Sequence, residues 1–208
     1  MSYLVLVRHG ESIWNEKGMW TGFKDVPLTE KGKQEAREAG KLIKEVKFEV
    51  GFSSPLTRAT QTMDEIKKEL IKNDFPVFQD IALNERDYGE YTGKNKWEIK
   101  KLVGDKEFFK IRRSWDHPIL KGESLKDVYN RVLPYYKDEI LPELQKGKNV
   151  LICAHGNSLR ALVKFLENIS DDDISKLEMA TGEVYVYQVD EKGSIVSKEI
   201  KNYKPNLA

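Results

Sequence analysis

Two apolar runs of the sequence end in the same way, and they constrain the fold more than any other feature. Residues 4–10 (LVLVRHG) and residues 149–156 (NVLICAHG) each place a His-Gly pair directly after an apolar run. A short continuous apolar run is typical of a strand buried on both faces of a parallel sheet. In such sheets ligands bind beyond the carboxyl ends of the strands. The two histidines are therefore predicted to share one crevice.

The rest of the chain alternates predicted strands with predicted helices. Further strands are predicted at residues 50–53, 76–79, 184–189 and 194–200, and the last two form a closing hairpin. This order predicts an α/β fold: a three-layer sandwich in which a mostly parallel sheet has helices on both faces and one antiparallel edge strand. No shift of composition marks a boundary, so residues 1–208 are predicted to form a single domain.

Local signals indicate where the helices begin. Thr29, Ser54 and Ser124 are predicted N-caps, with Pro55 in the first helical position and Pro134 kinking the helix after Ser124. Residues 11–27 and 81–96 are predicted to be loops, followed by two short helices ending near residue 113. A further short helix is predicted after residue 170, and another from about residue 157.

The composition excludes several classes of partner. Lys and Arg number 35 and Asp and Glu 34, which gives a net charge of +1 and no global field to recruit nucleic acid or anionic lipid. No apolar run has the length of a membrane span, and no signal peptide is recognisable. The single cysteine, Cys153, excludes an internal disulfide. A cytoplasmic protein with neither a nucleic acid nor a membrane as partner is expected.

Basic side chains near the predicted crevice indicate an anion site. Arg8 follows the first strand, and Arg58 lies in the first turn of the helix after residues 50–53. Each guanidinium can donate paired N–H bonds to phosphoryl oxygens. The helix that follows Gly156 adds its positive N-terminal dipole. These groups together predict a site for a tetrahedral phosphoryl dianion.

Histidines at such a site point to covalent phosphoryl transfer. One neutral imidazole, held in one tautomer, can attack phosphorus and carry the phosphoryl group. The second imidazole, protonated or hydrogen-bonding, would stabilise charge on the equatorial oxygens in the transition state. A proton donor and acceptor is also required, because an alkoxide is a poor leaving group. Glu85 is the candidate, with a pKa predicted to be raised by partial burial.

Competing chemistries fit the sequence less well. A zinc site would have to use the three histidines and one cysteine, yet Arg8 stands beside His9 and repels a cation. Cysteine-dependent phosphatases place an arginine after five intervening residues, and Arg160 is one position too late after Cys153. No Gly-x-Ser-x-Gly elbow or Walker loop occurs in the sequence.

The motifs resemble those of the histidine phosphatase superfamily and, within it, those of the cofactor-dependent phosphoglycerate mutases. Arg-His-Gly alone is weakly specific, whereas Asn-Glu-Arg-x-Tyr-Gly, Arg-Arg and His-Gly-Asn-Ser-Leu-Arg are strongly specific. The resemblance covers nearly the whole chain, through residues 4–15 (LVLVRHGESIWN), 21–23 (TGF), 83–89 (LNERDYG), 93–96 (GKNK), 112–114 (RRS), 122–125 (GESL), 154–160 (AHGNSLR) and 180–182 (ATG).

This resemblance implies a reaction and a set of site residues. The reaction is the interconversion of 3-phosphoglycerate and 2-phosphoglycerate through a phosphohistidine on His9, primed by 2,3-bisphosphoglycerate and without a metal. The implied catalytic residues are His9, Glu85, His155, Arg8 and Arg58. The implied substrate-binding residues are Arg8, His9, Gly10, Glu11, Ser12, Asn15, Thr21, Gly22, Arg58, Glu85, Arg86, Tyr88, Lys96, Arg112, Arg113, Gly156 and Asn157.

Other interpretations remain open at this point. A phosphatase for small phosphorylated metabolites would share the fold and His9, and a non-catalytic phospholigand-binding protein would need only the anion site. Lys96, Arg112 and Arg113 could form a solvated basic face, the usual place of such residues. Trp14 and Trp20 could simply pack within their loop, and no catalytic role is assigned to them. A monomer or a homodimer is expected, with small-molecule phosphoglycerates as partners.

Overall fold

The computed structural model describes residues 1–70 and 73–202 of the 208-residue chain. Within these residues one sheet has the strand order β3-β2-β4-β1-β5-β6. Strands β3, β2, β4 and β1 are parallel, while β5 is antiparallel to both of its neighbours. The predicted mostly parallel sheet is confirmed, and its antiparallel edge is the β5–β6 hairpin. The bounds are β1 (Ser2–Arg8), β2 (Val50–Ser53), β3 (Val77–Gln79), β4 (Val150–Ala154), β5 (Val184–Val189) and β6 (Ile195–Lys201).

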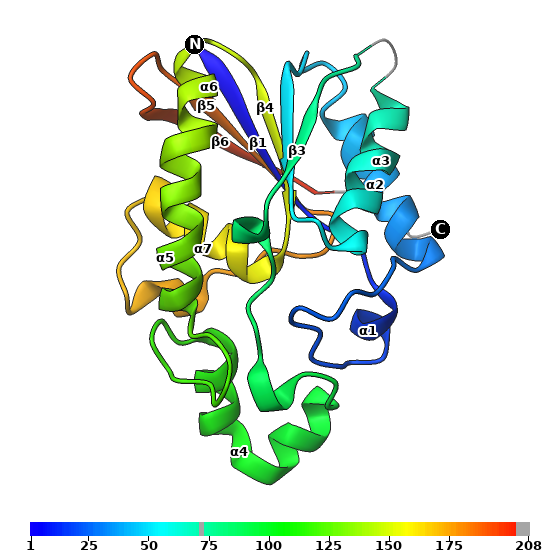
Figure 1. Ribbon diagram of the computed structural model, residues 1–208, viewed down its shortest axis with the longest axis vertical. Helices are drawn as coiled ribbons and strands as arrows, with labels where there is room; N and C mark the ends of the chain where they lie inside the picture. The colour runs from blue at the N-terminus through cyan, green and yellow to red at the C-terminus, as the bar shows by residue number, and fades with distance from the viewer. Residues whose placement is uncertain (71–72, 203–208) are drawn as a thin grey trace.

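Helices cover both faces of the sheet, as Figure 1 shows. One face carries α2 (Glu30–Leu42) and α3 (Thr57–Glu69), and the other carries α5 (Leu125–Tyr135), α6 (Leu141–Gln145) and α7 (Gly156–Leu166). Alternate residues of β1 separate the two cores: Leu4 and Leu6 pack in the core on the α5–α7 side, and Val5 and Val7 pack in the core on the α2–α3 side. All four are fully buried. Burial of each contributes about 1.5–3 kcal/mol, so β1 stabilises both layers at once.

Two of the predicted helix starts are confirmed. The Thr29 hydroxyl accepts a hydrogen bond from the Gly32 N–H at the start of α2. Ser124 and Asp127 form a reciprocal capping box at the start of α5. Pro134 lies inside α5, which continues as the π-helical segment η3 (Tyr136–Ile140). The change of helix type follows directly after the proline.

Helix α3 begins at Thr57, so the predicted start at residues 54–55 is wrong. The Ser54 hydroxyl donates to Asn84 Oδ1 at 2.6 Å and accepts from the Leu56 N–H at 3.2 Å, which lies one residue before the helix. The first N–H of the helix is satisfied instead by Asp25, which accepts from the backbone and hydroxyl of Thr57 at 2.7 Å each. A cap supplied from a distant loop has no local sequence signal.

Short helical turns interrupt the predicted loops. Residues 11–27 contain α1 (Ile13–Glu16), which Ser12 caps, and residues 81–96 contain the 3-10 turns η1 (Ile81–Leu83) and η2 (Gly89–Tyr91). The short helix expected after residue 170 is the 3-10 turn η4 (Asp173–Lys176). No helix in the described part of the chain is long and apolar enough to cross a membrane.

A third, smaller core lies beyond the carboxyl ends of the parallel strands. Helix α4 (Lys96–Arg113) passes there through a non-helical Gly104 with φ 78°, which gives the two short helices predicted (Figure 1). Trp20 is 1% exposed and packs in this core with residues of α4 and the following connector, which are Ile99, Phe108, Ile111 and Ile119. Trp20 thus packs outside its own loop, and it ties α4 to the loop after β1.

The turn after His9 leaves no room for a side chain. A Cβ on Gly10 would lie 2.1 Å from the Gly32 carbonyl oxygen, so β1 and the first turn of α2 would have to separate. We expect Gly10→Ala to lower the free energy of unfolding by about 1–3 kcal/mol or more. Urea unfolding measures this. In the control Gly156→Ala the nearest atom to the new Cβ, on Arg8, is 3.5 Å away. Equal unfolding midpoints for both variants would contradict the close approach.

Candidate active site

The register of β1 against β4 brings the two histidines together. Val7 is paired with Cys153 and Arg8 with Ala154, in parallel. The next residue on each strand is a histidine, and the His9 N–H still donates to the Ala154 carbonyl at 3.0 Å. Because both chains leave the sheet at the same height, the ring centroids of His9 and His155 are 4.9 Å apart.

The neighbouring strands deliver two further predicted residues to the same edge. Ser53 at the end of β2 is paired with Cys153, and Gln79 at the end of β3 is paired with Ser53. Helix α3 follows β2 and carries Arg58 in its first turn, and the loop after β3 carries Glu85. The segments that follow four neighbouring strands of the sheet therefore supply Glu85, Arg58, His155 and His9.

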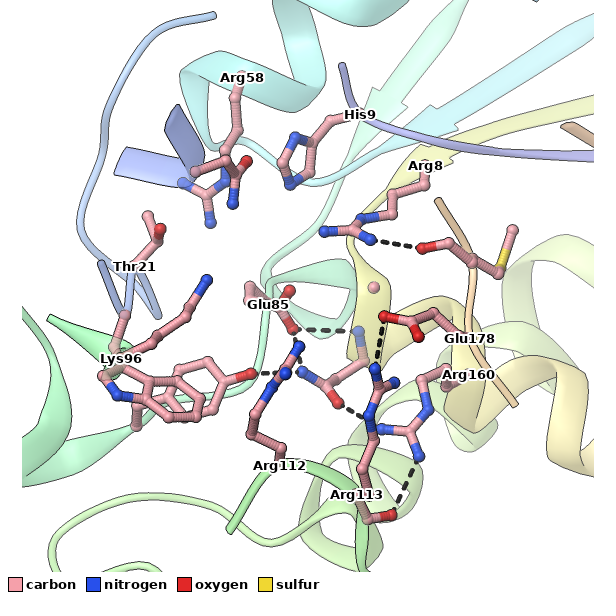
Figure 2. Close-up of a pocket in the computed structure, with 16 residues that line it drawn as sticks. Arg8, His9, Thr21, Arg58, Glu85, Lys96, Arg112, Arg113, Arg160 and Glu178 are labelled. Atoms are coloured by element: carbon pink, nitrogen blue, oxygen red, sulfur yellow. Dashed lines mark hydrogen bonds and ion pairs between the residues drawn. The ribbon is translucent and has the colours of Figure 1, made fainter. Parts of the chain in front are cut away.

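A pocket opens at this edge, and Figure 2 shows the side chains around it. Cations reach it from two sides: Arg8 and Arg58 from the sheet edge, and Lys96, Arg112 and Arg113 from α4. Predicted residues that line the pocket are Arg8, His9, Asn15, Thr21, Arg58, Glu85, Tyr88, Lys96, Arg112, Arg113, Gly156 and Asn157.

His9 is held as a neutral imidazole in one tautomer. Its Nδ1 lies 2.7 Å from the Gly10 carbonyl oxygen, which can only accept, so Nδ1 carries the proton. Nε2 is left with its lone pair. Burial, with Arg58 and Arg8 nearby, lowers the pKa of His9 well below its ordinary value. A neutral ring with a fixed proton on one nitrogen is the form that can act as a nucleophile through the other.

His155 packs against the ring of His9 in the protein interior. It is fully buried, and its ring meets that of His9 at an interplanar angle of 62° without lining the pocket. Burial lowers the pKa of His155 as well, with contributions from Arg58 and His9. Neither of its ring nitrogens has a hydrogen-bond partner within residues 1–70 and 73–202. Such a ring can donate a hydrogen bond to an anion without first giving up another partner.

Glu85 is a carboxylate with a lowered pKa, so the predicted rise is wrong. Burial alone would raise its pKa, but the Arg86 N–H and the side chain of Asn157 donate hydrogen bonds that outweigh burial, with help from Arg8 and Arg58. Asn157 donates twice to Glu85 Oε1, from its backbone at 3.1 Å and from Nδ2 at 2.9 Å. Hydrogen bonds to the charged form stabilise it. Without a ligand, Glu85 is poised to accept a proton.

The pocket is strongly cationic. Six of its described lining residues are Arg or Lys, and two are carboxylates. Burial, followed by Arg112 and Arg8, lowers the pKa of Lys96 to about 8. Within the described residues, Arg8 Nε and Thr21 Oγ1 are buried without a hydrogen-bond partner. Unpaired donors among like charges fit an anionic ligand.

Main-chain carbonyls hold the arginines at the sheet edge, and no carboxylate among the described residues pairs with them. Arg58 donates to the Gly22 and Lys24 carbonyls at 2.9 Å each, and Arg8 donates to the Met179 carbonyl. A carbonyl satisfies an N–H without cancelling the charge, so these side chains are oriented and remain cationic. Gly22 therefore serves Arg58 and does not line the pocket. Its φ of 52° is readily adopted by glycine.

Other predicted binding residues also lie outside the pocket lining. Gly10 packs against α2, and Ser12 caps α1 by accepting from the Asn15 N–H. Glu11 accepts from Thr29 and Lys31, which joins the loop to α2. These residues shape the loop after β1.

Arg86 likewise stands behind the pocket surface. It is fully buried, donates to the Ile111 carbonyl and lies 4.6 Å from the centroid of the Tyr88 ring. Tyr88 lines the pocket and Arg86 does not, so the substrate contact expected for Arg86 stays a prediction.

Sequence reasoning missed four residues of the lining: Trp20, Arg160, Glu178 and Met179. Arg160 had a signal, because it closes the His-Gly-Asn-Ser-Leu-Arg motif one helical turn after Gly156. It donates to Asn157 Oδ1 at 2.9 Å, which leaves the amide nitrogen of Asn157 facing Glu85. Glu178 and Met179 lie between η4 and β5, where no motif marks them.

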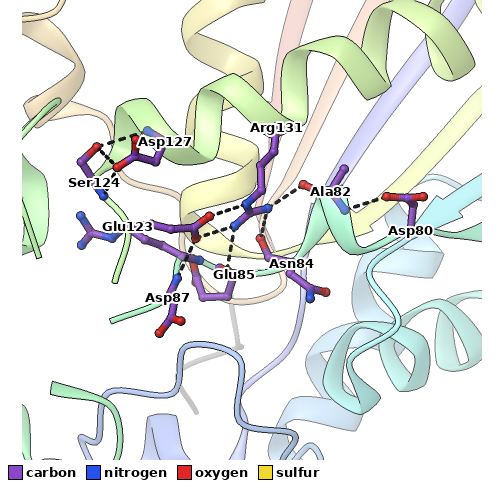
Figure 3. A network of polar contacts seen from close by, with 10 residues as sticks. Asp80, Ala82, Asn84, Glu85, Asp87, Glu123, Ser124, Asp127 and Arg131 are labelled. Carbon is purple, nitrogen blue, oxygen red and sulfur yellow. Dashed lines mark hydrogen bonds and ion pairs between the residues drawn. The ribbon is translucent and has the colours of Figure 1, made fainter. Parts of the chain in front are cut away.

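A single guanidinium on α5 fixes the loop that carries Glu85 (Figure 3). Arg131 donates to the carbonyls of Ala82, Asn84 and Glu85 at 2.7–3.0 Å. It also donates to both carboxylate oxygens of Glu123, at 2.8 and 2.9 Å. Five donors in a rigid fork thus define the path of the loop.

The fold and this site define a class of protein. An α/β sheet with two histidines and two arginines at its carboxyl edge is typical of phosphohistidine enzymes, and residues 4–201 match the sequence family described as "Histidine phosphatase superfamily (branch 1)". The chain belongs to this superfamily.

Within this superfamily, the chain is similar to proteins that share one name. It is 48% identical over 199 residues to the 2,3-bisphosphoglycerate-dependent phosphoglycerate mutase of Parvibaculum lavamentivorans, covering 95% of each chain. It is 49% identical over 197 residues to the mutase of the same name from Bradyrhizobium diazoefficiens, covering 94% of this chain and 95% of that one. Among solved structures it is similar to YhfR of Bacillus stearothermophilus, with a TM-score of 0.81 at 29% identity over 94% of both chains.

We expect Arg131→Lys to reduce the turnover number for phosphoryl transfer by about 10- to 100-fold, because small misplacements of a catalytic group have effects of this size. Lysine keeps the charge but cannot hold three carbonyls and a carboxylate together. Circular dichroism checks folding. The control is Arg37→Lys, which alters a 2.7 Å ion pair to Glu65 between α2 and α3. Equal turnover in both variants would show that Arg131 does not position Glu85.

Proposed function

We propose that this protein is a 2,3-bisphosphoglycerate-dependent phosphoglycerate mutase that interconverts 3-phosphoglycerate and 2-phosphoglycerate through a phosphohistidine on His9. The observation that carries the proposal is the division of the pocket cations into two groups, one beside His9 and one on α4. A phosphatase needs to hold one phosphoryl group. A mutase must also hold an intermediate with two phosphates and a carboxylate, and the second group of cations provides for this.

The first step is attack by His9. Nε2 carries the lone pair because Nδ1 donates to the Gly10 carbonyl. Arg8 and Arg58 bind the phosphoryl oxygens and keep the group in line with the ring. His155 donates to an equatorial oxygen as negative charge accumulates there in the transition state. 2,3-Bisphosphoglycerate supplies the phosphoryl group that first loads His9.

Glu85 moves the proton. Its lowered pKa makes it the base that takes the proton from a substrate hydroxyl as the oxygen attacks phosphorus. Arg8 and Arg58 contribute to that low pKa, and a bound phosphoryl dianion offsets their charge. The pKa of Glu85 therefore rises when the site is loaded, and the same carboxyl can return the proton to a leaving oxygen.

The α4 cations hold the rest of the ligand. Lys96, Arg112 and Arg113 would bind the carboxylate and the second phosphate, with Thr21, Asn15 and Tyr88 as neutral partners. The concentration of positive charge disfavours a divalent metal in the same pocket. The proposed reaction is accordingly metal-independent, and His9 takes the role that a metal-bound nucleophile has in other phosphoryl transferases.

A coupled assay with His9 variants tests the proposal. We expect catalytic 2,3-bisphosphoglycerate to stimulate isomerisation of 3-phosphoglycerate and to label His9, and His9→Ala to abolish both. His117→Ala is the matched control, because His117 pairs with Glu107 away from the pocket. Inorganic phosphate as the main product would favour a phosphatase for small phosphorylated metabolites. Loss of activity on chelation would contradict the metal-independent mechanism.

The lowered pKa of Lys96 predicts a pH dependence of binding. Lys96 is cationic below pH 8 and loses its charge as the pH rises through about 8, whereas a phosphate ester is already a dianion above its second pKa of about 6. The affinity for 3-phosphoglycerate should therefore weaken above pH 8 by up to about tenfold per pH unit.

Calorimetry at pH 7, 8 and 9 measures this effect. Lys96→Arg, which keeps its charge, should flatten the profile. Lys94→Arg is the control, because Lys94 does not line the pocket, and it should keep the wild-type profile. A wild-type profile in Lys96→Arg would assign the titration to another group.

A further inference from the structure

Glu178 is an acidic side chain in a pocket whose described lining includes six Arg or Lys residues. Its Oε1 lies 2.5 Å from Arg113 Nη2, and both residues line the pocket (Figure 2). It lies in the segment between η4 and β5, opposite α4. The hydrogen bond from Arg113 lowers the pKa of Glu178, which keeps it a carboxylate at neutral pH. A carboxylate of the protein itself is therefore paired with a guanidinium that is proposed to bind the substrate.

The two partners differ in their freedom to move. The side chain of Glu178 is 61% exposed, whereas that of Arg113 is 16% exposed. The main chain on each side is anchored: Arg8 donates to the Met179 carbonyl, and Arg160 donates to the Arg113 carbonyl. An exposed carboxylate can turn into solvent without being buried unpaired, so Glu178 is the partner that a ligand can displace.

A mutase needs limited affinity for its most highly charged ligand. Each phosphate ester carries a charge of about −1.5 to −2 at pH 7, so a doubly phosphorylated glycerate gains most from every free cation. A pocket with six unopposed cations would hold that species far more tightly than either product. When the ligand must first displace a carboxylate from one of these cations, the difference in affinity between the doubly and the singly phosphorylated glycerates becomes smaller.

We propose that Glu178 is a specificity-determining counter-ion, which competes with the distal anionic group of the ligand for Arg113 and so limits the preference for doubly over singly phosphorylated glycerates. The proposal rests on the proposed mutase function, because it requires both kinds of ligand to use this pocket. Glu178 touches the cation that binds the ligand and has no part in the phosphoryl transfer itself.

The test is a double-mutant cycle on ligand binding. Calorimetry measures the affinity for 2,3-bisphosphoglycerate and for 3-phosphoglycerate in a His9→Ala background, which cannot accept the phosphoryl group. We expect Glu178→Gln to tighten binding of the bisphosphate by about two- to fivefold, the range of one partly exposed charge pair. Binding of 3-phosphoglycerate should tighten less. Neither gain should appear when Arg113→Met is also present.

A charge-matched control separates this local effect from net charge. Asp173→Asn removes the same charge from an exposed residue of η4 that pairs with Lys176, and it should leave both affinities unchanged. The half-activating concentration of 2,3-bisphosphoglycerate in the otherwise wild-type enzyme should fall with Glu178→Gln and not with Asp173→Asn. This readout requires no His9 variant.

Each other outcome decides against one proposal. If the bisphosphate binds but Glu178→Gln leaves its affinity unchanged or weaker, the counter-ion proposal is wrong and the mutase function stands. An equal gain with and without Arg113→Met would also overturn it, since the effect would not pass through Arg113. If neither phosphoglycerate binds to any folded variant or to the wild-type protein, the proposed function itself fails.

Discussion

The hydrogen bond from the His9 N–H to the Ala154 carbonyl ends the pairing of β1 with β4, and the chemistry of the site depends on it. It places His9 and His155 at matching positions just after two adjacent parallel strands, with their ring centroids 4.9 Å apart. The β2 and β3 ends follow in register and add Arg58 and Glu85. Because the strands are buried on both faces, a shift of register would move every core side chain, so the position of His9 is protected by the stability of the whole sheet.

Concentrating six cations in one pocket opposes folding, and the structure limits that effect in two ways. Both histidines remain neutral, because burial and the arginines lower their pKa values. The guanidinium groups of Arg8 and Arg58 bind main-chain carbonyls, so they are ordered without losing the charge that attracts phosphate. Glu178, which pairs with the pocket residue Arg113, has a largely exposed side chain, and solvent weakens such an ion pair.

Features that depend on local pattern could be predicted from the sequence. The strands at residues 4–7 and 150–154, the caps Thr29 and Ser124, and the order of elements follow from apolar runs and side-chain chemistry. Features that depend on distant partners could not. Burial opposes the lowered pKa of Glu85, which results from the adjacent Arg86 N–H and from Asn157, 72 residues away. The start of α3 is set by a loop carboxylate.

The same distinction applies to the site lining. A motif shows which residues belong together but not which of them face the ligand: Arg86 and Gly22 lie behind the surface, where they hold Tyr88 and Arg58. Glu178 lies outside every motif that was recognised, although it touches Arg113, because only tertiary folding brings it to α4.

The small core around Trp20 gives the α4 region hydrophobic support separate from the two cores of the sheet. The groups proposed to perform phosphoryl transfer lie at the edge of the sheet, and the cations proposed to bind the remainder of the ligand lie on α4. Substitutions around Trp20 can therefore change which phosphate ester is accepted without disturbing the nucleophile. An ancestral phosphohistidine scaffold could diversify its substrates through this region alone, while its reaction chemistry stayed constant.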